Sequence, residues 1–499
     1  MTVLPTTVVV PTVGRASLRA LLEALRDSGG PRVSQIIVVD DRPQGDDLAG
    51  SLADLGLDDL RVVRSGGGGP ARARNLGWRL ARTRWVSFLD DDVVPDHDWR
   101  ARLQDDLDAA EATVAGSQGQ VRVPLPDDRR PTDWERSTAG LASAQWITAD
   151  MTYRRSWLAS VGGFDERFPR AFREDADLGL RVSEAGGRLV RGRRSITHPV
   201  RPTDDWVSVR QQTGNADDVL MRRLHGPRWR ERAGAPSGRR PRHLAIMAVA
   251  GASLLLAAAG RRRAAAGAGA LWAVGTAEFA LTRILPGPRD VAEVRRMLVT
   301  SAAIPVAASW HTALGHWRHR RVRPWRGLPD LVLFDRDGTL VHDVPYNGDP
   351  ELVQAVASAT TSLERLRGAG VRVGVITNQS GIGRGVITSE QTQAVNTRVD
   401  QLLGPFDVFH VCPHTPDAGC ECRKPAPGMI TQACASLEVE PAKCVVVGDI
   451  GSDVEAAEAA GARGILVPNS ATRPGETTAA ARTATDLARA VDDILAGAW

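Results

Sequence analysis

The stretch LVLFDRDGT, from Leu331 to Thr339, decides the fold of the C-terminal part of the chain. Its four apolar residues predict a buried β-strand, and the polar residues that follow predict a loop at the end of that strand. Asp335 and Asp337 lie two residues apart on the same side of the chain, and Gly338 permits a sharp turn. A carboxylate in this position can attack phosphorus when a cation neutralises the phosphate, so the stretch predicts an α/β site for phosphoryl chemistry.

Three later segments supply the other groups that such a site needs. VRVGVITNQS (371–380) ends a strand at Thr377, whose hydroxyl can donate to a phosphoryl oxygen, and VVVGDIGSD (445–453) ends another with two aspartates. CRKPAPG (422–428) carries one of only two lysines among 63 basic residues. We expect a nucleophile, a proton donor, two phosphate-binding groups and a Mg²⁺ site, formed by Asp335, Asp337, Thr377, Lys424, Asp449 and Asp453.

The five cysteines all lie in one short stretch, which favours a local metal site in a reducing compartment over a disulfide framework. Cys412, His414, Cys420 and Cys422 follow the spacing C-x-H-x5-C-x-C, and three thiolates with one imidazole suit a closed tetrahedral zinc. Such a zinc would fix the loop that leads into Lys424. The alternative is a set of buried free cysteines, as we expect for Cys434 and Cys444.

These motifs resemble phosphohydrolases of the haloacid-dehalogenase (HAD) type, and more narrowly the D-glycero-D-manno-heptose 1,7-bisphosphate phosphatase and histidinol-phosphatase group. The resemblance rests on DRDGTL, TNQSGIGRG, CPHTPDAGCECRKPAPGM and VGDIGSD. It implies an aspartyl-phosphate mechanism and substrate contacts from Asn378, Arg423 and Asp453. Only about one helix fits between Asp337 and Thr377, so we expect no separate cap domain.

The N-terminal part carries a second acidic strand end, in WVSFLDDD (85–92). Asp90 and Asp92 point the same way and can hold a divalent cation against a diphosphate. An earlier strand ends at Asp40 and Asp41, which suit hydrogen bonds to a base or a ribose. GGGGPARARNLGW (66–78) brings Arg72 or Arg74 to phosphate oxygens. An acidic turn that merely caps the strand is the alternative for the aspartates.

Together with GGFDE and ED-x-DLGLR, these segments resemble a family 2 glycosyltransferase of the nucleotide-diphospho-sugar transferase (GT-A) fold, over about residues 6–224. The resemblance implies Mg²⁺ or Mn²⁺ at Asp90 and Asp92, and nucleotide contacts from Asp40 and Arg74. It also implies that Asp175 is the base of an inverting transfer. His198 is either a further metal or diphosphate contact or a structural residue. The absence of a QxxRW motif argues against a polymer-extruding synthase.

The middle of the chain has a different composition, with apolar runs at residues 243–260, 264–285 and 298–313. These runs predict either membrane-associated helices or an Ala-rich bundle packed on the first domain. Because both α/β domains need cytoplasmic substrates, a membrane interpretation requires an even number of crossings or helices that lie on the surface. We predict two Rossmann-like three-layer α/β domains at 1–225 and 328–499, joined by a helical segment at 226–327.

A formal net charge of +4 over 499 residues, without a basic helix that interleaves aromatic residues, argues against nucleic-acid binding. No secretory signal is recognisable, so we expect a cytoplasmic protein, at the inner face of the membrane if the middle segment associates with it. The predicted function is a bifunctional enzyme that dephosphorylates a sugar phosphate and transfers a sugar from a nucleotide donor to an unidentified acceptor. Heptose 1,7-bisphosphate is favoured because a sugar transferase is fused in the chain. The alternatives are histidinol phosphate, and a non-catalytic sugar-nucleotide-binding N-terminal module.

Overall fold

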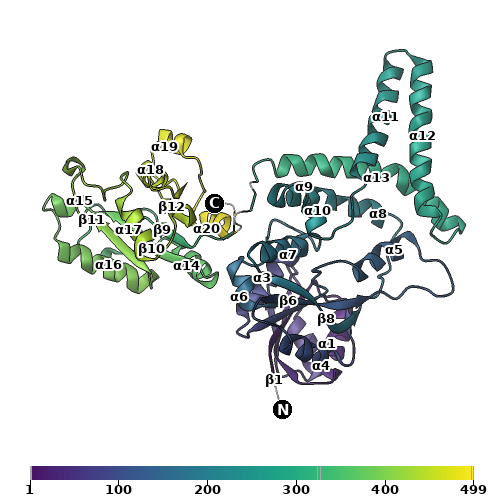
Figure 1. Cartoon of the computed structure of the whole chain (residues 1–499), viewed down its shortest axis with the longest axis horizontal. Helices are drawn as coiled ribbons and strands as arrows, with labels where there is room; N and C mark the ends of the chain where they lie inside the picture. Colours follow the sequence, from purple (N-terminus) through teal and green to yellow (C-terminus); the bar gives the residue numbers. More distant parts are fainter. Residues whose placement is uncertain (1–2, 323, 326, 496, 498) are drawn as a thin grey trace. The chain divides into compact units, whose positions relative to one another are not determined.

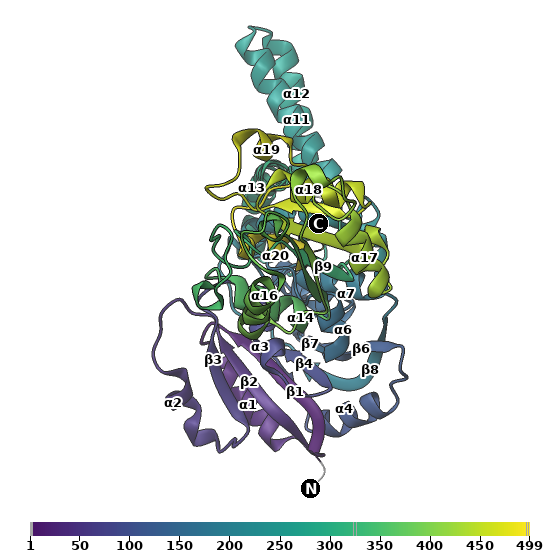
Figure 2. The same ribbon diagram turned by 90° about the vertical axis from the view of Figure 1, so that its left-hand side faces the viewer.

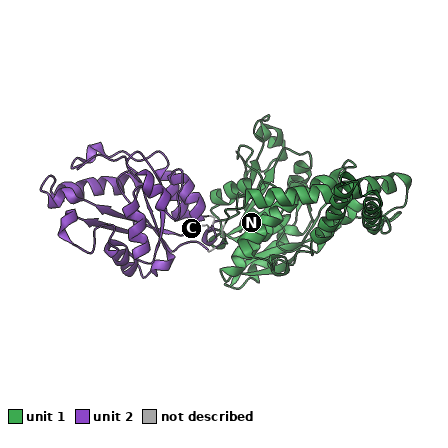
Figure 3. Cartoon of the chain, turned by 90° about the horizontal axis from the view of Figure 1, so that it is seen from above, with its two compact units in different colours: residues 1–158, 163–324 green, residues 159–162, 325–499 purple. Residues whose placement is uncertain are grey.

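The computed structural model describes residues 3–322, 324–325, 327–495, 497 and 499. These residues form two compact units, one of residues 1–158 and 163–324 and the other of residues 159–162 and 325–499 (Figure 3). Each unit has its own β-sheet and its own core, as the two α/β patterns predicted. The middle helices belong to unit 1, and the division of the chain into three parts remains a prediction.

Unit 1 is built on an eight-stranded mixed sheet in the order β3-β2-β1-β4-β7-β6-β8-β5. Figure 2 shows the first seven of these strands side by side in this order. The first four are parallel to one another, whereas β7 runs antiparallel to both β4 and β6. Their bounds are β1 Val3–Thr12, β2 Arg32–Asp40, β3 Leu60–Arg64, β4 Trp85–Leu89, β5 Val94–Pro95, β6 Val114–Arg122, β7 Asp150–Arg154 and β8 Arg188–Thr197.

Successive residues of a strand point to opposite faces of the sheet, and the buried strands of this sheet are apolar on both faces. Helices therefore cover both faces. Val8 and Val10 of β1 pack into a core with α1 (Ser17–Asp27) and α4 (Trp99–Asp108). On the other face α3 (Pro70–Leu80) approaches so closely that a Cβ on Gly77 would lie 2.3 Å from Val9 Cγ1. The remaining short helices of the α/β part are α2 Leu48–Leu52, α5 Asp133–Ala139, α6 Arg155–Ser160, α7 Glu174–Glu184, α8 Val207–Arg210, α9 Gly214–His225 and α10 Trp229–Arg232.

Three long helices complete unit 1: α11 (Arg240–Ala258), α12 (Arg262–Ile284) and α13 (Val291–Arg318). All three are long and apolar enough to cross a membrane. The pair α11 and α12 forms a hairpin that projects away from the rest of unit 1, and α13 runs past its base (Figure 1). At that base Arg283 donates hydrogen bonds to Asp133 Oδ2 at 2.7 Å and Thr300 Oγ1 at 2.8 Å.

Unit 2 is a five-stranded parallel sheet in the order β11-β10-β9-β12-β13. Residues of its central strand alternate between two cores: Val332 and Phe334 on one face, Leu331 and Leu333 on the other. Helices therefore cover both faces, as the predicted three-layer arrangement requires. The bounds are β9 Leu331–Phe334, β10 Arg372–Asn378, β11 Val408–Cys412, β12 Cys444–Gly448, β13 Arg463–Leu466, α14 Ala359–Gly368, α15 Ser380–Gly383, α16 Ser389–Leu403, α17 Gly428–Ser436, α18 Gly451–Ala459, α19 Pro474–Ala479 and α20 Leu487–Leu495.

Strand order explains how the catalytic motifs of unit 2 meet. The strands β9, β10 and β12 are adjacent and parallel, so their carboxyl ends lie at one edge of the sheet. Only a short segment with a single α-helix, α14, connects β9 to β10, and no cap domain is present among the described residues of this segment. The site predicted from Asp335, Thr377 and Asp449 is therefore built at that edge.

We expect Leu363→Ala to destabilise unit 2 by about 2–5 kcal/mol, because the side chain is fully buried between α14 and the sheet and truncation leaves a cavity. Denaturant unfolding of the full chain should show a shift in one transition only. Leu352→Ala is the matched control, since Leu352 is 51% exposed and should change the stability by less than about 0.5 kcal/mol. Equal effects of the two substitutions would contradict the assignment of this core.

Candidate active sites

The centre of the site in unit 2 is the buried ammonium of Lys424. Its Nζ lies 2.6 Å from Asp335 Oδ1 and 2.6 Å from Asp453 Oδ1, and it donates to the Ile376 carbonyl oxygen at 3.1 Å. Burial opposes its charge, but the carboxylates of Asp335 and Asp453 raise the pKa of Lys424 above its ordinary value. Lys424 is therefore a fixed cation beside the carboxylate predicted to be the nucleophile.

Asp335, Asp449 and Asp453 bring carboxylate oxygens within 4.8 Å of one another, and all three residues are buried. Burial raises the pKa of Asp335 to about 8, with Lys424 opposing the shift and Asp453 adding to it. Burial and Asp453 also raise the pKa of Asp449 to about 6. One ammonium cannot balance three buried carboxylates, so this group fits a divalent cation held by oxygen ligands.

Asp337 points to different partners. Arg336 donates to both of its carboxylate oxygens, at 3.0 and 2.8 Å, and Gln379 Nε2 donates to Asp337 Oδ2 at 2.7 Å and to Thr377 Oγ1 at 3.0 Å. Arg336 is held in turn by Asn396 Oδ1 at 2.6 Å. The side chain of Asp337 is therefore oriented independently of the three-carboxylate group, as a separate proton donor and acceptor requires.

The predicted substrate contacts of unit 2 have other partners in the structure. Asn378 Nδ2 donates to the Lys424 carbonyl oxygen, and Asn378 Oδ1 accepts from the Lys424 backbone N–H, both at 3.1 Å. Arg423 donates to the His414 carbonyl oxygen at 3.2 Å. Asp453 is 0% exposed beneath Lys424. Asn378 and Asp453 thus hold Lys424 in place, and direct contact of these residues with a substrate remains a prediction.

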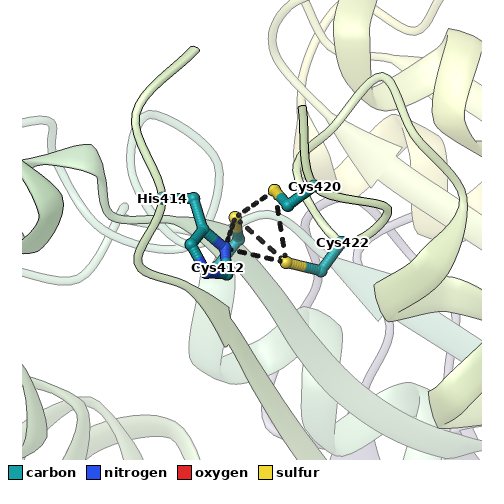
Figure 4. A group of neighbouring side chains, drawn as sticks. All are labelled: Cys412, His414, Cys420 and Cys422. Carbon is teal, nitrogen blue, oxygen red and sulfur yellow. Dashed lines mark hydrogen bonds between the residues drawn. The ribbon is translucent and has the colours of Figure 1, made fainter. Parts of the chain in front are cut away.

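The cysteine and histidine side chains converge as predicted (Figure 4). Cys412 ends β11, His414 follows in the next loop, and Cys420 and Cys422 come from the loop that leads to Lys424. The sulfur–sulfur distances are 3.3, 3.5 and 3.8 Å, and His414 Nδ1 lies 3.3 and 3.7 Å from two sulfurs. Edges of about 3.6–3.8 Å follow from zinc–ligand bonds of 2.0–2.3 Å in a tetrahedron, so the four side chains fit a zinc ion.

In unit 1 a cleft of about 250 Å³ opens at the carboxyl ends of β1 and β4. The predicted triplet lines it, and each aspartate has its own basic partner: Arg74 for Asp90 at 2.7 Å, Arg15 for Asp91 at 2.5 Å, and Arg201 for Asp92. Carboxylates and arginines in one cleft suit a diphosphate with its cation. The charged residues of its lining are Arg15, Asp41, Arg74, Asp90, Asp91, Asp92, Arg170 and Arg201.

The structure separates the two neighbouring aspartates at the end of β2. Asp40 is 0% exposed and is bound by Arg42 Nε at 2.9 Å, and this arginine lowers its pKa. Asp41 lines the cleft and accepts hydrogen bonds from the backbone N–H groups of Gly68 and Gly69 at 2.9 and 2.8 Å. Asp41 is therefore the one that faces the cleft, and the predicted nucleotide contact of Asp40 requires Arg42 to move.

The predicted base lies beside a buried ion pair. Arg74, which is 1% exposed, donates to Glu174 Oε1 at 2.8 Å as well as to Asp90. Asp175 accepts from the Ala176 N–H at 2.7 Å, and burial raises its pKa. Burial and Asp175 raise the pKa of Glu174 to about 8. A carboxyl group whose proton affinity is raised in this way suits general base chemistry.

His198 lies next to the triplet, with Nε2 3.7 Å from Asp92 Oδ2. Arg201, which contacts the same oxygen, was not predicted from the sequence, and neither were Arg170, Gln379 and Arg336. Gln379 and Arg336 lie inside two of the motifs quoted above, so their positions in the sequence could have indicated that they belong to the site. Arg170 and Arg201 carry no such signal, because only the folded loops bring them to the cleft.

Comparisons with known proteins divide the chain in the same way. Residues 7–177 match the family described as glycosyl transferase family 2, and residues 421–494 match the family described as HAD-hydrolase-like. A probable D-glycero-D-manno-heptose-1,7-bisphosphate 7-phosphatase of Thermoplasma acidophilum is 38% identical over 122 residues, which are 24% of this chain and 76% of the relative. A D-glycero-beta-D-manno-heptose-1,7-bisphosphate 7-phosphatase of Pseudomonas aeruginosa is 37% identical over 142 residues, 28% of this chain and 80% of the relative.

Two solved structures are also similar to parts of the chain. A D,D-heptose 1,7-bisphosphate phosphatase from B. bronchiseptica, complexed with magnesium and phosphate, is 31% identical with a TM-score of 0.31, and the match covers 33% of this chain and 98% of the other. A mannosyltransferase from Pyrobaculum calidifontis, in complex with GDP-Man and Mn²⁺, is 19% identical with a TM-score of 0.40. The match covers 62% of this chain and 87% of the other.

We expect Asn378→Ala to lower kcat for phosphate release by roughly 10–100-fold with little change in KM, because both of its hydrogen bonds position the Lys424 backbone. Steady-state kinetics on the full chain with a sugar bisphosphate would measure both constants. Asn378→Asp keeps the acceptor for the Lys424 N–H and should lose less. An increase in KM alone would indicate instead that Asn378 contacts the substrate directly.

Proposed function

Because the chain belongs, through its C-terminal unit, to the D-glycero-D-manno-heptose-1,7-bisphosphate 7-phosphatase family of HAD-type hydrolases and carries an N-terminal family 2 glycosyltransferase domain, we propose that it is a bifunctional enzyme of sugar metabolism. Unit 2 would release phosphate from a sugar phosphate, and unit 1 would transfer a sugar from a nucleotide donor. The observation that most strongly supports the phosphatase function of unit 2 is the contact of Lys424 with both Asp335 and Asp453.

In the proposed phosphatase reaction a carboxylate oxygen of Asp335 attacks the phosphorus, and the bond from phosphorus to the sugar oxygen breaks. Asp337 gives its proton to that leaving oxygen. Asp337 then takes a proton from a water molecule, whose oxygen attacks the phosphorus and regenerates Asp335 with release of inorganic phosphate. Asp337 has partners of its own in Arg336 and Gln379, and this supports a role for Asp337 that differs from the role of Asp335.

Mg²⁺ is the cation that we propose for this unit, with Asp335, Asp449 and the Asp337 backbone carbonyl as its ligands and Asp453 nearby. When bound, it neutralises charge on the phosphate. Lys424 would supply a second positive charge. The hydroxyl of Thr377, which lies at the same strand edge and 3.0 Å from Gln379 Nε2, would donate to a phosphoryl oxygen. The shifted pKa values of Asp335 and Asp449 support a cation at this position.

We propose D-glycero-D-manno-heptose 1,7-bisphosphate as the substrate, with heptose 1-phosphate as the product. The support is the identity of 34–38% to relatives named as phosphatases of that compound, over 76–84% of their lengths. The fused transferase domain is consistent with a sugar substrate. Histidinol phosphate is the competing substrate that a direct comparison of kcat/KM must exclude.

For unit 1 we propose inverting transfer from a nucleotide sugar, with Mg²⁺ or Mn²⁺ held by Asp90 and Asp92. Arg201 and Arg170 line the same cleft and would meet the diphosphate. Asp175 would take the proton of the acceptor hydroxyl. The acceptor oxygen would then attack the anomeric carbon of the donor sugar, and the nucleoside diphosphate would leave. Both substrates are phosphorylated metabolites, so we place both units in the cytoplasm. The three apolar helices of unit 1 support a location at the inner face of the membrane.

Two substitutions should separate the two activities in the full chain. We expect Asp335→Asn to reduce phosphate release by at least about 10³-fold while donor turnover stays within twofold, because only the nucleophile of unit 2 is lost. Asp175→Asn should reduce donor turnover and leave phosphate release within twofold, because only the proposed base of unit 1 is lost. Phosphate release from heptose 1,7-bisphosphate and sugar transfer, or hydrolysis, from a panel of nucleotide sugars measure the two rates.

If Asp335→Asn leaves phosphate release intact, the proposed nucleophile is refuted. If no donor is turned over by the unmodified chain but donors still bind, unit 1 is a binding module. Preference for histidinol phosphate by kcat/KM would reassign the substrate while keeping the chemistry.

We also propose that Cys412, His414, Cys420 and Cys422 hold a structural zinc. Elemental analysis of the full chain should give one zinc per molecule, and Cys422→Ser should lose it and lower phosphate release roughly 10–100-fold through the loop that positions Lys424. Cys434→Ser is the matched control, because Cys434 is buried outside the cluster. Equal zinc content in both variants would contradict the assignment.

A further inference from the structure

The hairpin of α11 and α12 is fixed at one end and uncovered at the other. At its base Ile246 and Phe279 pack with Ile304 of α13, and Arg242 forms an ion pair with Glu278. Between Met247 and Glu278 Ala265 is the single buried residue. A soluble protein rarely leaves an apolar surface of this extent to water, so this part of the hairpin needs a partner.

The large apolar side chains of the outer part are strongly exposed. Leu254 and Leu255 of α11 are 74% and 73% exposed, and Leu271 and Val274 of α12 are both 66% exposed. Residues 243–260 contain no charged side chain and neither do residues 264–277. At 1.5 Å per residue these segments span about 27 and 21 Å, close to the hydrocarbon thickness of a bilayer when the flanking arginines extend toward the headgroups.

The charges at the two ends of the hairpin give its orientation. Its tip carries three arginines, whereas five lie in or within a few residues of its base, namely Arg239, Arg240, Arg242, Arg283 and Arg289. Three arginines are too costly to leave in the hydrocarbon, so a hairpin that enters the bilayer must carry them to the far interface. The excess of arginine at the base places the base on the cytoplasmic side.

The third apolar helix, α13, has two opposite faces. Its exposed large apolar residues lie within about 120° of one another at 3.6 residues per turn, and its buried residues occupy the other side of the helix. The buried face packs on unit 1, where a Cβ on Gly315 would lie 2.8 Å from Ala216 Cα of α9. The exposed face consists of Val291, Leu298, Val299, Val306, Trp310 and Trp317.

A helix that already packs one face on a soluble domain cannot cross a bilayer, but its exposed face suits the interfacial region, where tryptophan is favoured. We propose that α11 and α12 cross a phospholipid bilayer as a two-helix hairpin and that α13 lies in the interface on the cytoplasmic side. Two crossings keep units 1 and 2 on the same side. This topology sharpens the proposed location at the membrane and depends on neither catalytic activity.

The topology can be tested with single cysteines at three exposed positions of the full chain: Ser237→Cys before the hairpin, Arg262→Cys at its tip and Val386→Cys in unit 2. The five native cysteines all lie in unit 2. A membrane-impermeant maleimide added to intact cells should label the Arg262→Cys variant at least tenfold above the unmodified chain. The other two variants should be labelled only after permeabilisation.

Labelling of the Arg262→Cys variant only after permeabilisation would overturn the crossing and indicate a hairpin on the surface or between copies of the chain. Labelling of the Val386→Cys variant in intact cells would mean that α13 crosses, and it would also overturn the proposal.

A second measurement asks whether lipid is the partner. The double substitution Leu254→Arg with Leu255→Arg should lower the fraction of full-length protein that floats with phosphatidylcholine and phosphatidylglycerol vesicles at least tenfold. Leu352→Arg with Val386→Arg, at exposed apolar positions of unit 2, should leave it unchanged. A cooperative denaturant transition of unit 1 that matches that of the unmodified chain would show that unit 1 is folded in both proteins. Unchanged flotation of the first protein, or a soluble oligomer that forms without lipid, would refute the proposal.

Discussion

The site in unit 2 depends on the cost of burying one ammonium. Lys424 is 4% exposed, and its charge is stable there because Asp335 and Asp453 both contact it. Those three residues come from the end of β9, the loop after the cysteine cluster and the start of α18, so one electrostatic requirement fixes three separate segments. Asn378 adds the end of β10 by binding the Lys424 backbone. The proposed nucleophile, the proposed phosphate-binding cation and the proposed metal ligands are therefore held together by one set of contacts.

Unit 1 also has to stabilise buried charged groups, but it does so with several arginines. Its acidic triplet also follows a buried strand, but each aspartate is balanced by an arginine from a different segment: Arg74, Arg15 and Arg201. Arginine remains charged in all surroundings and forms several hydrogen bonds, so Arg74 can join Asp90 and Glu174 at once. One unit thus concentrates its positive charge on a lysine, and the other distributes it around an open cleft.

The sequence was sufficient to predict two α/β units and the residues at their strand ends, because strand ends and glycine turns are local signals. Asp335, Lys424, Asp449 and Asp453 come together in the structure, and so do the four zinc-binding candidates. What could not be predicted was the choice between neighbours. Asp40 and Asp41 are equivalent in the sequence, but the pairing of Asp40 with Arg42 removes it from the cleft. The role of Asn378 was also hidden, since its two bonds depend on how a loop 46 residues away folds back.

The two faces of α13 have a mechanical consequence. A soluble domain that is attached to a bilayer by a hairpin alone can both tilt and rotate about the point of attachment. A helix that packs on the domain along one face and on lipid along the other would prevent the tilting. In the arrangement that we propose, the cleft in unit 1 would therefore stay at a constant height above the headgroups. An acceptor dissolved in the same leaflet would be found by lateral diffusion in two dimensions, at a fixed distance from the cleft.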